Sequence, residues 1–452
     1  MLTLTEAAEQ IRSHRLSPVE LTRDSLSPID RLNPLVNAFI TVTADLALEQ
    51  ARQAESEIMA GNYRGPLHGI PIGLKDLLDT AGVLTTAASN QFRERVPAED
   101  AQLVTQLKQA GAVIVGKHNL HEFAFGMSGI VSAFGPAKNP WDVSRITGGS
   151  SSGSAAAVAA GMCLAALGTD TAGSVRCPPA LCGIVGLRPS AGMLSAAGMI
   201  PLARSFDTAG PLARTVRDAA ILLEELSGVP LIAALHEKTS GLRVGVAHKG
   251  FFDDLQPDVK LCLDAALAVI GTLVAEVQEV MLDVSRSRTV FNAEIYEYHA
   301  EMLARTPELY SSHTRARVLA CAGISASDYI RAQRELLDER CKAEAACAQV
   351  DVIITPTVPV VAPAMADLSP LGEPELRQFE TSHLLRNTAP FSVLYWPSVS
   401  VPCGFTRDGL PVGMQISGKP GGDATVLQLA HAYEQATEWH KREPGLIEDA
   451  RN

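Results

Sequence analysis

The sequence predicts an α/β fold, a layered sandwich in which helices cover a mixed sheet. Two observations lead to this prediction. Helical patterns alternate along the chain with short apolar runs typical of buried strands, and such alternation favours layered packing. Hydrophobic residues make up 46% of the 452 residues and charged residues only 19%. Because a chain of this length buries roughly three quarters of its unfolded surface, we expect a large core.

The first sixty residues are predicted to be helical. In "SPVELTRDSL", Ser17, Pro18 and Glu20 suit the N-cap, first and third positions of a helix with a capping box. The segment "LTLTEAAEQI" before it has the same character. From "GPLHGIPIGLKDLLD" onward, helices and apolar strands are expected to alternate.

Several strands are predicted along the rest of the chain. The run "AVIVGK" at 112–117 follows a helix that ends at Gly111, and "AAAVAAGMCLAALGTD" carries a small-residue helix into a strand. Three later strands are each bounded by Gly, Pro or Asp, namely "GLRVGVA", "VDVIITPTVP" and "SVSVPCGF".

Residues 286–348 differ from this pattern because they are polar, helical and rich in Glu and Arg. They predict a helical excursion over the rim of the sheet, near the substrate entrance, rather than a separate domain. Tyr296, Tyr298 and Tyr310 either line the mouth of a substrate site or occupy a half-exposed helix face. We treat residues 1–452 as a single domain.

Charge and composition limit the partners. The formal net charge is -12, so we expect neither nucleic acid nor a membrane surface as a partner, since both favour basic patches. The eight cysteines form no C-x-x-C pair, which predicts reduced thiols. His118 and His121 lack an H-E-x-x-H pattern, and we expect no metal and no cofactor. The N-terminus lacks the features of a secretion signal, so a cytoplasmic location is expected.

The stretch "RITGGSSSGSAAAVAAG" at 145–161 admits three interpretations. A phosphate-binding loop requires a lysine at the start of the helix, and no lysine lies between Lys138 and Lys238. A nucleophile elbow would use Ser151 in G-x-S-x-G, with candidates such as Asp351 and His383 downstream, but an elbow follows a buried apolar strand. The preceding "NPWDVSRITGG" is polar. In the third interpretation, the nucleophile lies elsewhere.

A second small-residue turn supports the third interpretation. In "GTDTAGSVRCPPALC", the residues from Thr171 to Ser174 follow an apolar run, and successive N–H groups in such a turn can form an oxyanion hole. Upstream, "GIPIGLKDLLD" places Lys75 in an apolar strand context. A lysine buried there has a lowered pKa and can act as a base.

These pieces occur with others in a characteristic order, including "GAVIVGKHNLHEFAFG", "NPWDVSRITGGSSSGSAAAVAAG", "LGTDTAGSVRCPPALCGIVGLRPS" and "SFDTAGPLART". In this order and over nearly its whole length, the chain resembles the amidase signature hydrolases. The resemblance implies a three-layer α/β/α sandwich with a large mixed central sheet. Within it, residues 1–60 would be N-terminal helices and residues 61–215 the signature core.

The resemblance also assigns roles to individual residues. Ser174 would be the nucleophile, Ser150 a bridging serine preceded by a cis peptide bond at Gly149, and Lys75 the base that acts through Ser150. The oxyanion hole would be formed by Thr171, Ala172, Gly173 and Ser174. Supporting hydrogen bonds are expected from Ser151, Thr169, Asp170 and Arg176, and a substrate pocket is expected near Phe125, Gly126, Met127 and Ser128.

The chain departs from the common family motifs at two positions. Ser152 and Ala172 stand where many members have glycine, and the resulting "GGSSSGSA" and "GTDTAGS" look closer to the allophanate hydrolase branch. Because Ala172 replaces a glycine, the backbone conformation of the oxyanion turn is the feature that this departure concerns.

The expected function is that of a serine amidohydrolase that cleaves C–N bonds of amides or carbamates, like an aryl amidase or urethanase, through an acyl-enzyme on Ser174. One alternative is an allophanate or other small-ureide hydrolase. An alternative of another class is the amidase-like subunit of a tRNA-dependent amidotransferase. A small-molecule amide, carbamate or ureide substrate is expected, and the resemblance suggests a homodimer.

Overall fold

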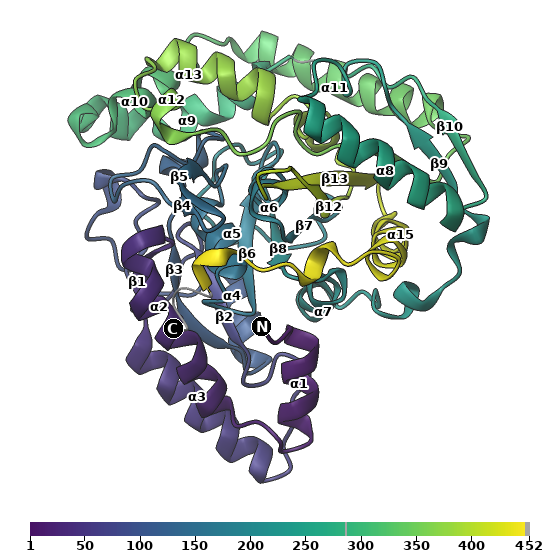
Figure 1. The fold of residues 1–452 in the computed structure, drawn as a ribbon. Helices are drawn as coiled ribbons and strands as arrows, with labels where there is room; N and C mark the ends of the chain where they lie inside the picture. The colour runs from purple at the N-terminus through teal and green to yellow at the C-terminus, as the bar shows by residue number, and fades with distance from the viewer. Residues whose placement is uncertain (285–286, 448–452) are drawn as a thin grey trace.

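The computed structural model describes residues 1–284 and 287–447. An eleven-stranded sheet runs through them in the spatial order β1-β3-β2-β6-β8-β7-β12-β13-β11-β9-β10 (Figure 1). Its strands are β1 (Phe39–Val42), β2 (Pro71–Lys75), β3 (Val113–His118), β6 (Ala165–Asp170), β7 (Val185–Arg188), β8 (Thr208–Ala213), β9 (Arg243–Val246), β10 (Glu276–Glu279), β11 (Val352–Pro356), β12 (Ser398–Phe405) and β13 (Pro411–Gly418). A separate hairpin pairs β4 (Lys138–Asn139) with β5 (Asp142–Ile146).

The sheet is mixed, as predicted. Strands β3, β2 and β6 are parallel to one another, and so are β11, β9 and β10. The strands between these two groups pair in antiparallel fashion from β6 through β8, β7, β12 and β13 to β11.

Side-chain alternation along the strands explains why helices cover both faces. In β3, Ile114 packs with one hydrophobic cluster, whereas Val113 and Val115 pack with another, because successive strand residues point to opposite faces. Helices of the first cluster are α1 (Leu4–Arg12), α4 (Gln102–Gln109), α7 (Val216–Ser227), α8 (Pro257–Leu273) and α15 (Asp423–Gln435). Helices of the second are α2 (Pro18–Val36), α3 (Ala44–Met59) and α5 (Ser152–Ala159). The predicted three-layer α/β/α sandwich is therefore confirmed.

The N-terminal helices follow the predicted signals with one difference. Ser17 caps α2 by accepting from the N–H groups of Val19 and Glu20. The complete capping box, however, lies in α1, where Thr3 and Glu6 bond reciprocally. Ser17 Oγ instead donates to the Glu55 carboxylate.

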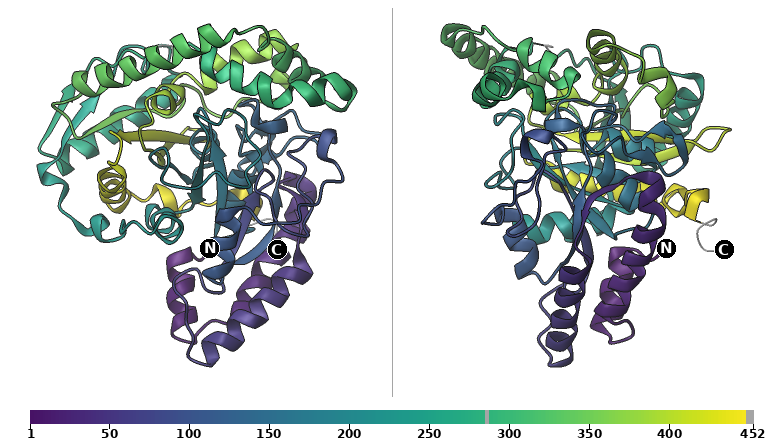
Figure 2. Two further views of the ribbon diagram at one scale, coloured as in Figure 1. Left: turned by 180° about the vertical axis from the view of Figure 1, so that it is seen from behind. Right: turned by 90° about the vertical axis from the view of Figure 1, so that its left-hand side faces the viewer.

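A further group of helices lies along one edge of the sandwich, at the top of Figure 1. It contains α9 (Thr289–Arg305), α10 (Ser312–Leu319), α11 (Ala326–Ala346), α12 (Met365–Leu368) and α13 (Glu373–Phe379). Two short helices, α6 (Cys177–Cys182) and α14 (Ala389–Val393), lie in the chain before β7 and β12 respectively. Figure 2 shows the edge helices and the N-terminal helices at opposite ends of the molecule.

Helices α9 to α11 correspond to the predicted excursion of residues 286–348, although residue 286 itself lies outside the described residues. The single-domain assignment of residues 1–452 stays a prediction. Over the described ranges, no helix has the length and apolarity needed to cross a membrane.

Candidate active site

Two parallel strands bring the predicted site together. Lys75 is the last residue of β2, and Asp170 is the last residue of β6. Because parallel strands end at the same edge of a sheet, the turn that follows Asp170 lies beside Lys75. Lys75 is fully buried, and its Nζ is 2.7 Å from Ser150 Oγ and 2.8 Å from Thr169 Oγ1.

Burial changes the protonation of this lysine. Loss of solvation lowers the pKa of Lys75 from 10.5 to about 7, although the charges of Asp170 and Asp207 favour its protonated form. A group with a pKa near neutrality is partly unprotonated at pH 7 and can accept a proton. The structure thus gives Lys75 the buried surroundings that the sequence predicts.

Ser150 lies in the loop before α5, and the Gly149–Ser150 peptide bond is cis, as the resemblance implies. Ser151 Oγ donates to the carbonyl oxygen of Thr169 at 3.1 Å. Thr169 in turn accepts from Lys75 through its hydroxyl group. Ser151 and Thr169 thus tie the serine-rich loop to the end of β6 and hold Lys75 against Ser150.

The turn from Thr171 to Ser174 offers unpaired backbone donors. Among the described residues, the N–H groups of Thr171, Ala172, Gly173 and Ser174 donate no hydrogen bond. Thr388 Oγ1 donates to the Ala172 carbonyl oxygen at 2.8 Å, which fixes the orientation of this peptide group. Such a turn can stabilise a developing negative charge on a carbonyl oxygen.

The two residues at the centre of this turn have different requirements. Gly173 has φ +145°, and a Cβ there would lie 2.1 Å from Thr388 Oγ1, so a side chain is excluded. Ala172 has no positive φ, and its methyl group fits at the pocket wall. The departure from glycine at position 172 therefore leaves the turn intact.

Ser174 completes only part of the expected relay. Its Oγ donates to Met127 Sδ at 3.6 Å, and the hydrogen bond of Ser150 Oγ is with Lys75. Among the described residues, no hydrogen bond joins the hydroxyl groups of Ser150 and Ser174. Catalytic hydrogen bonds often tighten only when substrate binds.

A buried ion network lies beneath the turn. Arg176 and Arg188 approach Asp170 at 3.0 and 2.9 Å, and all three side chains are buried. Burial alone would raise the pKa of Asp170, but the two guanidinium groups hold it well below its usual range. Arg176 also donates to Gln415 Oε1 and to the Thr388 carbonyl oxygen, both at 2.8 Å, which ties the turn to β13 and to the start of α14.

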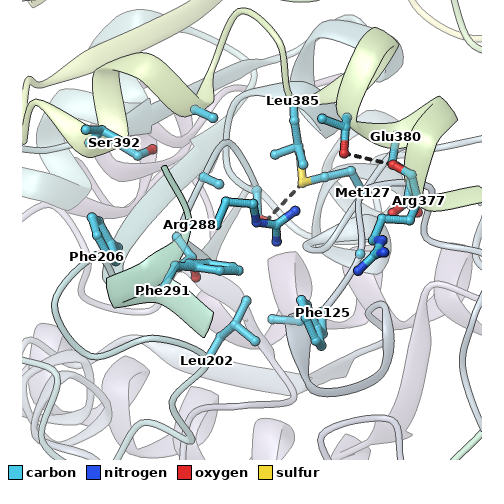
Figure 3. Close-up of a pocket in the computed structure, with 18 of the residues that line it drawn as sticks. Phe125, Met127, Leu202, Phe206, Arg288, Phe291, Arg377, Glu380, Leu385 and Ser392 are labelled. Atoms are coloured by element: carbon cyan, nitrogen blue, oxygen red, sulfur yellow. Dashed lines mark hydrogen bonds between the residues drawn. The ribbon is translucent and has the colours of Figure 1, made fainter. Parts of the chain in front are cut away.

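A pocket with a cavity of about 150 Å³ opens over Ser174. Three of the residues expected near a substrate pocket, Phe125, Gly126 and Met127, line it together with Ala172. The other predicted pocket residue, Ser128, does not line it. Its backbone N–H donates to Glu380 at 2.9 Å, and its hydroxyl group is buried. Figure 3 shows Met127 above Arg288 and Phe125 below it in this view.

The tyrosines predicted near the substrate entrance do not reach the pocket wall. None of Tyr296, Tyr298 and Tyr310 lines this pocket, and they pack with a hydrophobic cluster of the edge helices. Of the two interpretations, the structure favours the helix face for Tyr296 and Tyr298, which lie on α9, whereas Tyr310 is buried before α10 with its hydroxyl group 2.8 Å from His299 Nδ1. The residues that α9 does contribute to the pocket are Phe291 and, at its N-cap, Arg288.

Sequence reasoning missed several residues of the site. Arg188 lies in the motif "LGTDTAGSVRCPPALCGIVGLRPS", but the sequence alone assigned no function to it. Asp207 accepts from Thr171 Oγ1 at 2.6 Å. Arg317 donates to Glu380 at 2.8 Å and to the Phe125 carbonyl oxygen at 2.8 Å, so helix α10 holds the pocket loop in place. Arg317 and Glu380 lie far from the motifs in sequence, and no local pattern identifies them.

The histidines that we considered as metal ligands are buried instead. Burial lowers the pKa of both His118 and His121 to about 3, and His118 Nδ1 lies 3.2 Å from Ser154 Oγ. Across the residues that the structure describes, no group of three or more His, Cys, Asp or Glu side chains could hold a metal ion.

Comparisons with known proteins place the chain in one family. A family model described as Amidase matches residues 20–427. One relative, from Carboxydothermus hydrogenoformans, is named as a component of the glutamyl-tRNA(Gln) amidotransferase. It is 36% identical, over 98% of this chain and 99% of that protein. A protein of the same name from Roseiflexus sp. is 38% identical, over 98% of each chain.

Solved structures agree with this result. One, described as a vestigial protein complex that reveals the evolutionary origins of an s-triazine catabolic enzyme, has a TM-score of 0.89 and 31% identity, over 97% of this chain and 99% of that one. The peptide amidase of Stenotrophomonas maltophilia has a TM-score of 0.86 and 31% identity, over 98% of each chain.

The relatives correct one prediction from the sequence. We expected a small-molecule substrate with no nucleic acid and no membrane, and suggested a homodimer. That prediction was wrong, because the curated relatives are named as one component of an enzyme for glutamyl-tRNA(Gln). The net charge of -12 describes a single chain, and it cannot exclude a nucleic acid bound through another chain of an assembly.

Proposed function

The chain belongs to the amidase family, and from this we propose that it is the amide-cleaving component of a tRNA-dependent amidotransferase. In this role it breaks the C–N bond of an amide and releases ammonia, which partner chains direct to an activated acid on tRNA. The observation that carries the amide-cleaving part of the proposal is the contact of 2.7 Å between Lys75 Nζ and Ser150 Oγ, and the names of the curated relatives carry the amidotransferase part. The contact provides a base and a proton relay without any other group.

The proposed first step forms an acyl-enzyme. Ser174 turns from Met127 toward Ser150, neutral Lys75 takes the Ser150 proton, and Ser150 takes the Ser174 proton as Ser174 Oγ attacks the amide carbon. The carbonyl oxygen becomes negative and accepts from the free N–H groups of the turn that begins at Thr171.

The second step restores the enzyme. The proton held on Lys75 returns through Ser150 to the amide nitrogen, the C–N bond breaks, and ammonia leaves. A water molecule then attacks the acyl-enzyme by the same relay and releases the acid. Arg176 and Thr388 act here as positioning residues, because they hold the peptide groups of the turn in place.

The curated relatives support the amidotransferase role over an aryl amidase, a urethanase or a small-ureide hydrolase. Their alignments cover 98% or more of both proteins, so the proposal rests on the whole chain and not on the shared motifs alone. The acidic charge of the chain is compatible with this role if partner chains contact the RNA.

The test is ammonia release by the chain alone and together with the other amidotransferase components encoded in the same genome. The substrates are glutamine and biuret, whose cleavage is followed by ammonia release, and an N-aryl carbamate, whose cleavage is followed by release of the arylamine, with Ser174→Ala as the blank. We expect Ser174-dependent ammonia release from glutamine that increases on assembly and yields amidated tRNA. Faster cleavage of the carbamate or of biuret by the chain alone, with no effect of partners, would contradict the proposal.

A further inference from the structure

Asp207 joins two parts of the pocket over Ser174. It lies directly before β8, and one oxygen of its carboxylate accepts from the Thr171 hydroxyl group at 2.6 Å. The other oxygen accepts from the N–H groups of Leu202 and Ala203 at 2.9 and 3.1 Å. Thr171 begins the oxyanion turn, and both Thr171 and Leu202 line the pocket. A single carboxylate therefore holds the oxyanion turn against the pocket wall.

The partners of this carboxylate are neutral, unlike those of Asp170. Asp170 lies between the guanidinium groups of Arg176 and Arg188. Among the residues that the structure describes, no lysine, arginine or histidine nitrogen lies within 4.0 Å of the Asp207 carboxylate. Arg188 favours the negative charge of Asp207 from a greater distance and donates to the Phe206 carbonyl oxygen instead. The charge of Asp207 is thus not cancelled by a direct ion pair.

This charge acts on the base of the relay. Burial raises the pKa of Asp207 to about 6, and the hydrogen bonds that it accepts limit the rise, so the carboxylate is largely ionised at pH 7. Together with Asp170, it favours the protonated form of Lys75. Lys75 gains its proton only as Ser174 attacks, and a fixed negative charge therefore stabilises the state that follows proton transfer.

Resting on the amide-cleaving role proposed above, we infer that Asp207 is a positioning residue of the reaction, which fixes the oxyanion turn through Thr171 and stabilises the proton that Lys75 takes up. Asp207 does not line the pocket, so it acts through these two residues and not on the substrate. It links the two places where charge develops during attack, namely the carbonyl oxygen at the turn and the amine of Lys75.

A simpler role for Asp207 is to stabilise its own loop, since two of its three donors are N–H groups of that loop. In that case loss of the charge would lower stability, and it would lower activity to the same extent at every pH. Lys75 would then titrate as in the wild-type protein. The two roles therefore differ in the titration of Lys75.

The other titratable groups around Lys75 keep one charge state in the neutral range. Two guanidinium groups hold the pKa of Asp170 well below its usual range. Burial lowers the pKa of His121 to about 3, so this ring is neutral. Among the groups whose charge acts on Lys75, Asp207 is therefore the one whose removal tests the inference.

The first test follows the titration of Lys75 without turnover. Full-length Ser174→Ala protein is labelled with carbon-13 at the Cε atoms of lysine, and Lys75→Met identifies the Lys75 signal in NMR spectra recorded against pH. The midpoint should lie near a pH of about 7. Asp207→Asn should move it to lower pH, because the protonated amine loses a nearby negative charge.

Glu294→Gln is the matched control for this titration. Glu294 lies on α9 and accepts from the N–H and hydroxyl groups of Ser205, so it holds the same loop from the other side. It does not line the pocket. Glu294→Gln removes one carboxylate from this loop, as Asp207→Asn does, and it should leave the midpoint of Lys75 unchanged.

The second test measures ammonia release from glutamine. At pH values above the midpoint, Asp207→Asn should lower kcat by about 10–10²-fold, because the turn and the proton on Lys75 lose their support. Thr171→Val removes the donor to Asp207 and should lower kcat by about tenfold, whereas Thr171→Ser keeps the donor and should restore most of the loss. In Thr171→Val/Asp207→Asn, the losses should be less than additive, since both substitutions break one hydrogen bond.

An unchanged titration of Lys75 in Asp207→Asn, or an equal shift in Glu294→Gln, would overturn the inference. Wild-type kcat in Thr171→Val would overturn it as well, including the case in which Asp207→Asn does not fold. Failure of the proposed function is distinguishable, because it shows as a wild-type protein that releases no ammonia although Asp207→Asn shifts the titration of Lys75. Conversely, Ser174-dependent ammonia release with an unmoved titration leaves the amidase role standing and rejects the role of Asp207.

Discussion

The floor and the rim of the pocket are built in different ways. On the floor, Lys75, Ser150 and Asp170 are fully buried and hydrogen-bonded; Lys75 and Asp170 end strands β2 and β6, and Ser150 lies in the loop before α5. On the rim, Arg288 and Arg377 come from helices at the edge of the sandwich and are partly exposed. The floor thus holds its groups through buried hydrogen bonds, whereas the charged groups of the rim are partly exposed at the edge of the pocket. From this difference we expect the floor to carry the chemistry and the rim to influence the choice of substrate.

The largest expected effect concerns the floor. Ser174→Ala should lower kcat by about 10⁴-fold or more, because loss of a nucleophile removes most of the catalysis in serine hydrolases. Ser152→Ala is a matched control in the serine-rich loop, since Ser152 Oγ is buried without a hydrogen-bond partner. Steady-state ammonia release measures both. Comparable losses in the two variants would contradict the assigned nucleophile.

The second prediction concerns the base. Lys75→Ala should lower kcat/KM at pH 7 by roughly 10²–10⁴-fold, with partial recovery at high pH, where hydroxide replaces the amine. In the wild-type protein, kcat/KM should rise with pH and level off above a pKa of about 7, because only neutral Lys75 accepts the proton. A pH profile that is the same in both proteins would exclude Lys75 as the base.

The same group affects stability in a defined direction. The pKa of Lys75 falls from 10.5 in the unfolded chain to about 7 in the folded protein, so the unfolded state binds more protons between these values. The contribution of Lys75 to the free energy of unfolding therefore increases as pH rises from about 7 toward 10.5. Lys75→Met should raise Tm at pH 7, and a lower Tm there would contradict the account of its burial.

A fourth prediction compares ion pairs on the floor and on the rim. Asp170→Asn leaves Arg176 and Arg188 buried without their carboxylate, and it should lower the free energy of unfolding by about 3–5 kcal/mol. Arg377→Met breaks a pair with Glu373 in which the arginine side chain is 42% exposed. It should cost less than about 1 kcal/mol. Denaturant titration measures both, and similar losses would remove the distinction between the two regions.

The smallest effect is expected where the two regions meet. Met127→Leu removes the sulfur that accepts from Ser174 Oγ but keeps a side chain of similar volume. If that contact holds Ser174 away from Ser150 before substrate binds, kcat/KM should rise, by less than about tenfold. A strong loss of kcat would instead show that Met127 is needed for catalysis.

The difference between floor and rim also explains what the sequence could predict. Lys75, Ser150, Ser151, Thr169 and the turn to Arg176 stand in contiguous motifs, and parallel strands bring those motifs together. The mixed sheet and its layers follow from strand alternation, as at Ile114 and Val115.

The rim could not be predicted in this way. Arg288, Arg317 and Glu380 belong to helices whose positions depend on packing between segments far apart in the chain, so no local pattern reveals their contacts. Ser128 was predicted to line the pocket from its place beside Met127, but its backbone turns toward Glu380. The binding partners could not be predicted from the net charge either, because the charge of one chain gives no information on the other chains of an assembly.

The central claim is that Ser174 forms an acyl-enzyme with an amide substrate. We would quench the wild-type protein with acid during turnover of the best amide found, digest it, and measure peptide masses. The account predicts an acyl group on the peptide that contains Ser174, at the Ser174 hydroxyl group, and none in Ser174→Ala. An acyl group on Ser150, Ser151 or Ser152, or ammonia release with no acylated peptide at any time, would contradict it.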